Sequence, residues 1–403
     1  MQPLAVINAG SSSIKFALFE DDGEFPIIFR GQVEKLGVAP RLIVSDAEGG
    51  QLVEKSWQAS ELDHGSATAI ILETAISLLG GRPVRAVGHR VVHGGTRFSS
   101  PIRITSEIVA DLRKLCPLAP LHQPHNLAAI EAIASAAPHI PQIACFDTAF
   151  HRAQPDIAQM FAVPRELTDL GIRRYGFHGL SYEYVSMRLR ELAPRLADGR
   201  VIVAHLGNGS SLCAMCGGRS VATTMGFTAV DGLMMGTRCG AIDPGVLIYL
   251  MDERGMDARA LEELVYKKCG LIGVSGLSSD MRALRASKEP AAQAAIDLFV
   301  YRIVREIGSM AAASAGVDAI VFTCGIGQND AQTRAEIAKG CEWLGLSLND
   351  QLNKAGRERI DGEGSKIAAL VIPTDEEQMI ARHTSALLEP RHGPEEIVPT
   401  LRL

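Results

Sequence analysis

The chain contains the same local pattern twice, about two hundred residues apart. Residues 4–7 form a short apolar run, a turn rich in Gly and Ser follows at 8–13, and residues 14–19 are again mostly apolar. Residues 201–206, 207–211 and 212–215 repeat this order. Two apolar runs joined by a polar, glycine-containing turn are typical of a β-hairpin. The repetition predicts an internal duplication, with a cleft between two similar halves and one turn from each half facing it.

Strand and helix patterns alternate along the rest of the chain. Continuous apolar runs predict strands at 84–92, 142–146 and 319–323, and helical periodicity predicts helices at 66–79, 127–136 and 291–313. This mixture predicts an α/β fold. With 403 residues the chain exceeds the usual size of a single core, so we expect two domains. The motifs place one domain at 1–147 plus about 381–403, and the other at 148–380.

Composition excludes several classes of function. The net charge is −6, so no general positive field attracts nucleic acid or a membrane surface. The longest uncharged stretch, 201–218, contains His205, Asn208 and several glycines, so we do not expect a membrane helix there. The N-terminus has no signal-peptide pattern.

Eight scattered cysteines are typical of reduced thiols and predict a cytoplasmic location. Cys213 and Cys216 form an isolated CxxC, either a metal or redox pair or two buried small side chains.

The two hairpin turns offer a site for phosphate. The chain has neither GxxxxGK[ST] nor a GxGxxG after a predicted strand, so the common nucleotide fingerprints are absent. Successive glycines and serines present backbone N–H and hydroxyl donors that suit phosphate oxygens. Lys15 follows the first turn and can add a positive charge. The alternative is two ordinary hairpins with an exposed lysine.

Other charged side chains lie beside glycines or at strand ends. Arg90 lies in the segment 88–95, where a guanidinium can hold a carboxylate or phosphate with two hydrogen bonds. Asp147 directly follows the predicted strand 142–146, a usual position for functional carboxylates in α/β sheets. His178 and Arg238 lie in similar glycine-bounded loops. Each of these residues has a structural alternative. Two pairs with close spacing, His89 with His93 and His122 with His125, also leave metal ligation open.

These segments together resemble the acetate kinase family, within the superfamily of sugar kinases, actin and heat-shock ATPases. The resemblance runs from Val6 to about Thr384 and rests on ordered blocks at 8–15, 88–95, 119–122, 146–150, 174–179, 205–211, 225–228, 236–238, 242–244, 278–282, 324–329 and 372–377.

The resemblance implies a fold and a site. It implies two ribonuclease-H-like domains flanking a central cleft, a homodimer, and reversible transfer of a phosphoryl group between ATP and acetate, giving acetyl phosphate and ADP. It implies Mg²⁺, with Mn²⁺ as a plausible substitute. The implied metal residues are Asn8 and Glu376, and the implied catalytic residues are Arg90, Asp147, His178 and Arg238. Arg90, Val92, Leu121 and Phe177 are the implied acyl-substrate residues. The implied nucleotide residues are Lys15, His205, Leu206, Gly207, Asn208, Gly209, Asp280, Met281, Arg282, Gly325, Ile326, Gly327, Gln328 and Asn329.

The chain departs from the family pattern at a few positions outside the implied catalytic set. Ala229 stands where the family usually has proline beside the acyl pocket, and Ala222, Gln123, His125 and Gln328 are further departures. We expect Ala229 to enlarge the pocket and broaden its preference toward propionate, because one methylene in an apolar pocket is worth only about 1–3 kcal/mol.

Two other interpretations stay open on the sequence. One is a related kinase that acts on propionate or butyrate, or that uses pyrophosphate instead of ATP. The other is an ATP-switched actin-like or chaperone-like protein, against which the acyl-pocket residues argue.

Overall fold

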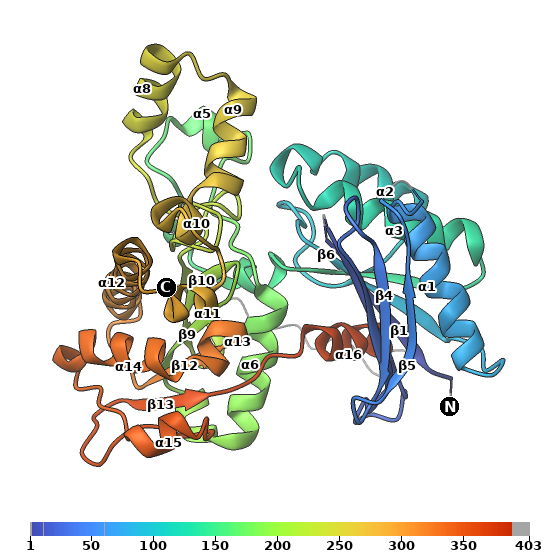
Figure 1. Cartoon of the computed structure of the whole chain (residues 1–403). Helices are drawn as coiled ribbons and strands as arrows, with labels where there is room; N and C mark the ends of the chain where they lie inside the picture. Colours follow the sequence, from blue (N-terminus) through green and yellow to red (C-terminus); the bar gives the residue numbers. More distant parts are fainter. Residues whose placement is uncertain (1, 11, 60, 389–403) are drawn as a thin grey trace.

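The computed structural model describes residues 2–10, 12–59 and 61–388. Two β-sheets form two lobes, with the N-terminal part of the chain in one and most of the C-terminal part in the other (Figure 1). We call the lobe built on the eight-stranded sheet the first lobe and the lobe built on the five-stranded sheet the second lobe. This arrangement confirms the predicted α/β class.

The first sheet begins with the predicted hairpin. Strands β1 (Leu4–Ala9) and β2 (Ile14–Phe19) pair antiparallel, and β1 pairs in parallel with β6 (Ala86–Val91), which pairs in parallel with β8 (Gln142–Phe146). The full order is β5 (Gln51–Ser56), β4 (Arg41–Asp46), β3 (Ile27–Glu34), β2, β1, β6, β8 and β7 (Ile102–Arg103).

The second sheet repeats the centre of the first. Its order is β11 (Arg219–Thr223), β10 (Ser210–Cys216), β9 (Arg200–Leu206), β12 (Ala319–Thr323) and β13 (Ala368–Val371). Strands β11, β10 and β9 pair antiparallel, and β9, β12 and β13 pair in parallel. In the first sheet, β3, β2 and β1 pair antiparallel, and β1, β6 and β8 pair in parallel. The two series therefore have the same strand directions in the same order. Both predicted hairpins are therefore present, and the two halves share one strand topology.

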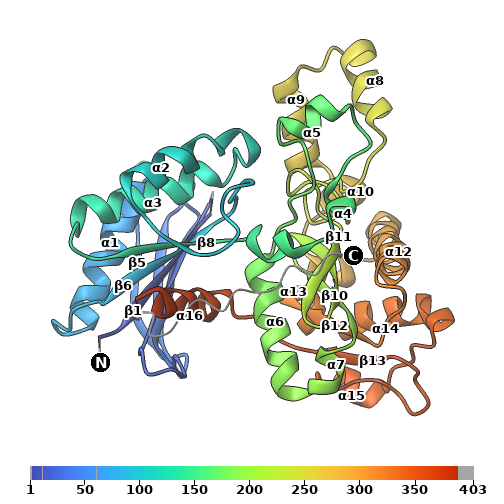
Figure 2. The ribbon, with the colours of Figure 1, turned by 180° about the vertical axis from the view of Figure 1, so that it is seen from behind.

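Helices cover both faces of each sheet. In the first lobe, α1 (His64–Leu78) and α3 (Gln123–Ala136) pack on one face, while α16 (Glu376–Leu388) packs on β1 and β6 from the other (Figure 2). In the second lobe, α12 (Pro290–Ala313) covers one face and α6 (Gly179–Leu192) and α7 (Pro194–Ala197) cover the other. The three predicted helices correspond to α1, α3 and α12. The central strands, such as β1, β8 and β12, can be apolar on both sides because both of their faces are covered.

The remaining helical elements are short. They are α2 (Ser106–Arg113), η1 (Cys116–Leu118), η2 (Ala149–Ala153), α4 (Asp156–Gln159), α5 (Arg165–Asp169), α8 (Pro244–Arg254), α9 (Ala258–Glu263), η3 (Leu264–Lys268), α10 (Gly270–Ser275), α11 (Met281–Ala286), α13 (Cys324–Asn329), α14 (Ala331–Gly340), η4 (Glu342–Leu344) and α15 (Asp350–Lys354). Helices α8 and α9 project from the second lobe together with α5 (Figure 1).

The chain passes between the lobes twice. After β8 it enters η2, where His151 Nδ1 accepts a hydrogen bond of 2.9 Å from Ser220 Oγ of the second sheet. It returns to the first lobe through α16, which also contacts α6. The predicted domain limits at 148 and 381 stay a prediction, and α16 extends across the second of them. Residues 389–403 of the predicted returning tail lie outside the described residues.

None of the helices in the described part of the chain is both long and apolar enough to cross a membrane. All eight cysteines are free thiols. Among the described residues, no group of three or more His, Cys, Asp or Glu side chains is arranged to hold a metal ion. Cys213 is buried in β10, where its Sγ lies 3.3 Å from Ser220 Oγ. Cys213 therefore packs as a small buried side chain.

Candidate active site

Arg90 and Asp147 meet at one edge of the first sheet. Arg90 lies near the end of β6, Asp147 directly follows β8, and these parallel strands are neighbours. The carboxyl ends of parallel strands meet at the same edge, so the two side chains are brought together. Arg90 Nε donates to Asp147 Oδ1 at 2.9 Å and Nη2 donates to Oδ2 at 2.5 Å. This bidentate pair fixes the plane of the guanidinium.

Asn8 and Glu376 complete an oxygen-rich cluster around Arg90. Asn8 Oδ1 accepts a hydrogen bond of 3.2 Å from Arg90 Nη1, and Glu376 Oε2 lies 3.6 Å from Arg90 Nε. Burial alone lowers the pKa of Arg90, but the carboxylates of Asp147 and Glu376 outweigh burial and raise it. Burial raises the pKa of Glu376, and Asp147 adds to this effect while Arg90 opposes it. Two carboxylates and an amide oxygen form a donor set that suits a hard cation such as Mg²⁺.

His178 is held rigidly at the start of α6. Its backbone is left-handed, with φ 59°, and its Nδ1 is 2.8 Å from Ser211 Oγ. The ring stacks on His205 at 4.0 Å between centroids, and His205 Nδ1 is 2.8 Å from Ser181 Oγ. Burial lowers the pKa of His178 well below its usual range, and the neighbouring His205 and two arginines lower it further. His178 is therefore a neutral hydrogen-bonding group near pH 7.

Gly209 lies between His178 and Arg238. A Cβ placed on Gly209 would be 3.3 Å from His178 Nε2 and 3.7 Å from Arg238 Nη1. Arg238 Nη1 also donates to the carbonyl of Ala229 at 3.0 Å. Burial lowers the pKa of Arg238, and the charge of Arg90 lowers it further. The groups predicted from separate loops thus surround one region, with Arg90 contributed by the first lobe.

His122 belongs to the same region, although the sequence indicated only an uncertain metal ligand. Burial and the charges of Arg238 and Arg90 lower its pKa to about 3. It lies directly before α3. Its ring therefore lies within electrostatic range of both arginines and is a second neutral imidazole near pH 7. Its segment, 119–122, was among the recognised blocks, but nothing in the local pattern distinguished a site residue from a structural one.

The other paired histidines have structural contacts. His89 Nε2 is 2.7 Å from the side-chain amide of Gln142, and His93 Nδ1 accepts from the backbone N–H of Gly95 at 2.9 Å. Burial lowers the pKa of each of these two histidines to about 4.

An apolar cluster adjoins the arginines. Val92 and Phe177 are 4% and 2% exposed, and they pack with Ala119, Met225 and Met235, while Ala229 packs against the group. This acyl-pocket cluster joins residues from both lobes. Two of the three predicted pocket residues are therefore in contact, whereas Leu121 is half-buried and is not a member of the cluster.

A cavity of about 900 Å³ opens in the second lobe beside the second hairpin turn. Eight predicted nucleotide residues line it: Gly207, Asn208, Asp280, Met281, Arg282, Gly325, Ile326 and Asn329. Ser279, Arg285, Ala286, Asp330 and Gln332 also line it and were not predicted. Five predicted residues, His205, Leu206, Gly209, Gly327 and Gln328, lie in the adjoining chain segments but are not among the lining residues.

A buried arginine supports one wall of this cavity. Arg334 is 1% exposed, and its Nη1 donates to the carbonyls of Gly327 at 2.9 Å and Gln328 at 2.7 Å. Its other nitrogens donate to the side chain and backbone carbonyl of Asn353. Gly327 and Gln328 therefore have a structural part, because their carbonyls anchor helix α13 to Arg334. No local pattern in the sequence predicted this role of Arg334, because its partners come from separate segments.

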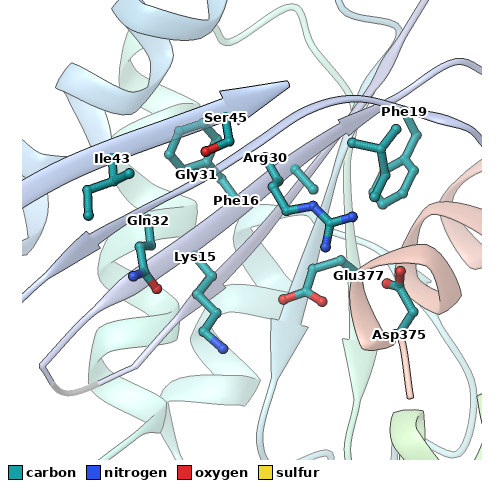
Figure 3. A pocket seen from close by; sticks show the side chains of 12 residues that line it. Lys15, Phe16, Phe19, Arg30, Gly31, Gln32, Ile43, Ser45, Asp375 and Glu377 are labelled. Atoms are coloured by element: carbon teal, nitrogen blue, oxygen red, sulfur yellow. The ribbon is translucent and has the colours of Figure 1, made fainter. Parts of the chain in front are cut away.

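Lys15 is the one predicted nucleotide residue that lies in the first lobe. It lines a separate cavity of about 300 Å³, next to the start of α16 (Figure 3).

The chain is similar to known proteins over nearly its whole length. The model of the acetokinase family matches residues 4–382. The acetate kinase of Rhodopseudomonas palustris (strain ATCC BAA-98 / CGA009) is 52% identical over 392 residues, covering 96% of this chain and 98% of that protein. The acetate kinase of Methylocella silvestris is 50% identical and covers 95% and 97%.

Two solved structures share the fold. The crystal structure of Porphyromonas gingivalis acetate kinase has a TM-score of 0.87 at 39% identity, covering 96% of this chain and 100% of that one. A propionate kinase from Francisella tularensis has a TM-score of 0.89 at 34% identity, covering 95% and 99%. Because the family model and these relatives cover nearly the whole chain, the chain belongs to the acetokinase family.

Proposed function

We propose that this phosphotransferase moves a phosphoryl group directly between ATP and acetate, reversibly, giving acetyl phosphate and ADP. The observation that carries the proposal is the convergence of Arg90, His178 and Arg238 beside an apolar cluster lined by Val92 and Phe177. A cluster of positive and hydrogen-bonding groups beside a small apolar pocket suits a short carboxylic acid next to a phosphoryl group.

The parts of the candidate active site have separate roles. The nucleotide occupies the cavity of the second lobe, with its terminal phosphate toward Gly209. Arg90 binds the carboxylate of acetate, and the methyl group packs on Val92 and Phe177. Arg238 and neutral His178 stabilise the charge on the phosphoryl oxygens during transfer. Phosphoryl transfer needs alignment and charge stabilisation rather than covalent help from the protein.

No general base is needed, because a carboxylic acid is already ionised at pH 7. Asp147 therefore acts as a positioning residue: its two hydrogen bonds to Arg90 hold the guanidinium in the orientation that receives the substrate carboxylate.

Asn8 and Glu376 would hold Mg²⁺, with Asp147 close by. Mg²⁺ keeps several waters and takes phosphate oxygens as ligands, so few protein oxygens are required. A metal held by these residues would supply positive charge that neutralises the phosphate oxygens. Mn²⁺ has the same preference for oxygen ligands and is expected to replace it.

The test is formation of acetyl phosphate from ATP and acetate, trapped as its hydroxamate, with and without Mg²⁺. Pyrophosphate in place of ATP serves as the competing donor. The proposal requires acetate- and metal-dependent product with ATP. ATP turnover that is unchanged by added acetate would instead support an ATP-switched protein.

A second candidate substrate, propionate, rests on Ala229. It packs against the acyl-pocket cluster, and its carbonyl also accepts from Arg238. Filling this position with a proline ring should favour acetate over propionate by about 1–3 kcal/mol. Comparing kcat/KM for both acids in wild type and Ala229→Pro measures this shift; an unchanged ratio would remove Ala229 as a determinant of chain length.

The proposed assembly is a cytoplasmic homodimer. Apolar side chains of α8 are exposed, including Ile248 at 59% and Tyr249 at 53%, and such a surface is typical of an interface. Free cysteines agree with a reducing compartment. Light scattering on wild type and Tyr249→Glu tests the assembly: a wild-type monomer, or a dimer unaffected by the substitution, would contradict the proposed interface.

A further inference from the structure

The cavity beside Lys15 lies on the open part of one face of the first sheet. Helix α16 packs mainly on β1 and β6, so this face of β2, β3 and β4 is only partly covered. The strand register pairs Lys15 with Gln32 and Ala17 with Arg30, and Arg30 with Ser45 on the next strand. Directly paired residues point to the same face of a sheet. These side chains therefore line the cavity of about 300 Å³ between the strands and the start of α16.

Charges of both signs face this cavity. Lys15 and Arg30 extend from the strands, and Asp375 and Glu377 extend from the beginning of α16, with the guanidinium of Arg30 directed toward Glu377 (Figure 3). In the part of the chain that the structure describes, the side chains of Lys15 and Arg30 have no hydrogen-bond or ion-pair partner. The carboxylate of Glu377 accepts a hydrogen bond from its own backbone, and Asp375 Oδ1 accepts one of 2.8 Å from the backbone N–H of Gln378. The cavity thus separates positive groups on one side from negative groups on the other.

Apart from Gln32 and Ser45, the rest of the lining is apolar. Phe19, Ile27 and Ile43 contribute to the walls. A water molecule takes about 30 Å³ of liquid volume, so the space corresponds to roughly ten waters, or a ligand of about that many non-hydrogen atoms.

We propose that this cavity binds a small zwitterion, a free α-amino acid with an apolar side chain. Its carboxylate pairs with Arg30 and Lys15, its ammonium group pairs with Glu377 and Asp375, and its side chain packs on Ile43. A lone anion such as phosphate meets two carboxylates here, and a lone metal cation meets two positive side chains. A zwitterion satisfies both groups at once. This site shares Lys15 with the predicted nucleotide residues, but binding of a zwitterion here does not depend on the proposed phosphoryl-transfer reaction.

The test is calorimetric binding of free leucine to the whole protein. Acetate and MgADP are present in excess, so that Arg90 and the acyl pocket are occupied. Two probes each remove one charge: N-acetyl-leucine has no ammonium group and leucinamide has no carboxylate. We expect leucine to bind with Kd below about 1 mM and each probe to bind at least about tenfold more weakly.

Variants locate the binding. Arg30→Ala removes the carboxylate partner and Ser45→Tyr fills the space without changing a charge, and both should weaken leucine binding at least about tenfold. The matched control is Arg41→Ala, because Arg41 lies on the same sheet but pairs with Glu54 at 2.6 Å outside the cavity. Lys15 is left unchanged because it also belongs to the proposed nucleotide set.

Three results would each overturn the proposal. The first is no leucine binding by the wild type. The second is equal binding of N-acetyl-leucine or leucinamide, which indicates that one charge suffices. The third is leucine binding that survives both Arg30→Ala and Ser45→Tyr, which places the ligand elsewhere.

Discussion

Replacing Gly209 with alanine tests whether the phosphoryl group passes between His178 and Arg238. The new methyl carbon would lie 3.3 Å from His178 Nε2 and 3.7 Å from Arg238 Nη1, where ordinary contact begins at 3.4 Å. The free protein can accommodate this by a small movement of the imidazole. Gly209 is outside the left-handed region, so alanine is compatible with its backbone and should change the free energy of unfolding by less than about 1 kcal/mol.

Catalysis should respond far more strongly than stability. The methyl group fills the space in which the phosphoryl oxygens would contact His178 and Arg238, and non-bonded heavy atoms stay about 3.5–4.0 Å apart. The reacting group must then move by about 1 Å, a displacement that can cost about 100-fold in rate. We therefore expect kcat for hydroxamate formation to fall about 100-fold with little change in Tm.

Gly308→Ala is the matched control for this experiment. Gly308 lies in α12, and its added methyl carbon would make an ordinary contact of 3.5 Å with the ring of Trp343. Alanine in a helix interior is favoured over glycine by about 1 kcal/mol, so this variant should be slightly more stable with unchanged kcat. If Gly209→Ala keeps kcat within about threefold of the wild type and the same Tm, the transferring group does not occupy this space and the assigned roles are wrong.

Three further predictions concern charge and protonation. Arg238→Ala should lower kcat by about 10³-fold or more while nucleotide affinity, measured by calorimetry, changes little; a variant within tenfold of wild type would contradict the role of Arg238. The pKa of Cys324 is lowered, because the effect of the neighbouring His205 is larger than the opposing effect of burial. The pKa values of the other seven cysteines are raised by burial. Iodoacetamide at pH 7 should therefore modify Cys324 first, with MgATP slowing the reaction; peptide mapping that finds another thiol modified first would refute this. Burial lowers the pKa of His89 to about 4, so between pH 7 and 5 the unfolded chain gains a proton that the folded chain does not, and stability falls. His89→Asn should reduce the loss of unfolding free energy over this range by about 2 kcal/mol in urea titrations, and an equal loss in both proteins would show that His89 is not the source.

Local patterns in the sequence were sufficient for the elements that carry the site. The hairpins at both turns, the strand before Asp147 and the three long helices follow from apolar periodicity and glycine placement, which act over a few neighbouring residues. The position of Asp147 next to Arg90 was not predicted, because it depends on β6 and β8 being neighbours in the sheet.

Contacts between distant segments were decided only by the tertiary structure. No local pattern separates Leu121 from Val92 and Phe177, although only the latter two belong to the apolar cluster. Nor does any local pattern place Lys15 in a cavity apart from the other predicted nucleotide residues, or bury Arg334 against helix α13. The pKa of His122 likewise depends on arginines contributed by both lobes. Burial and electrostatics depend on which segments pack together, and this packing is set by the whole fold rather than by neighbours in the chain.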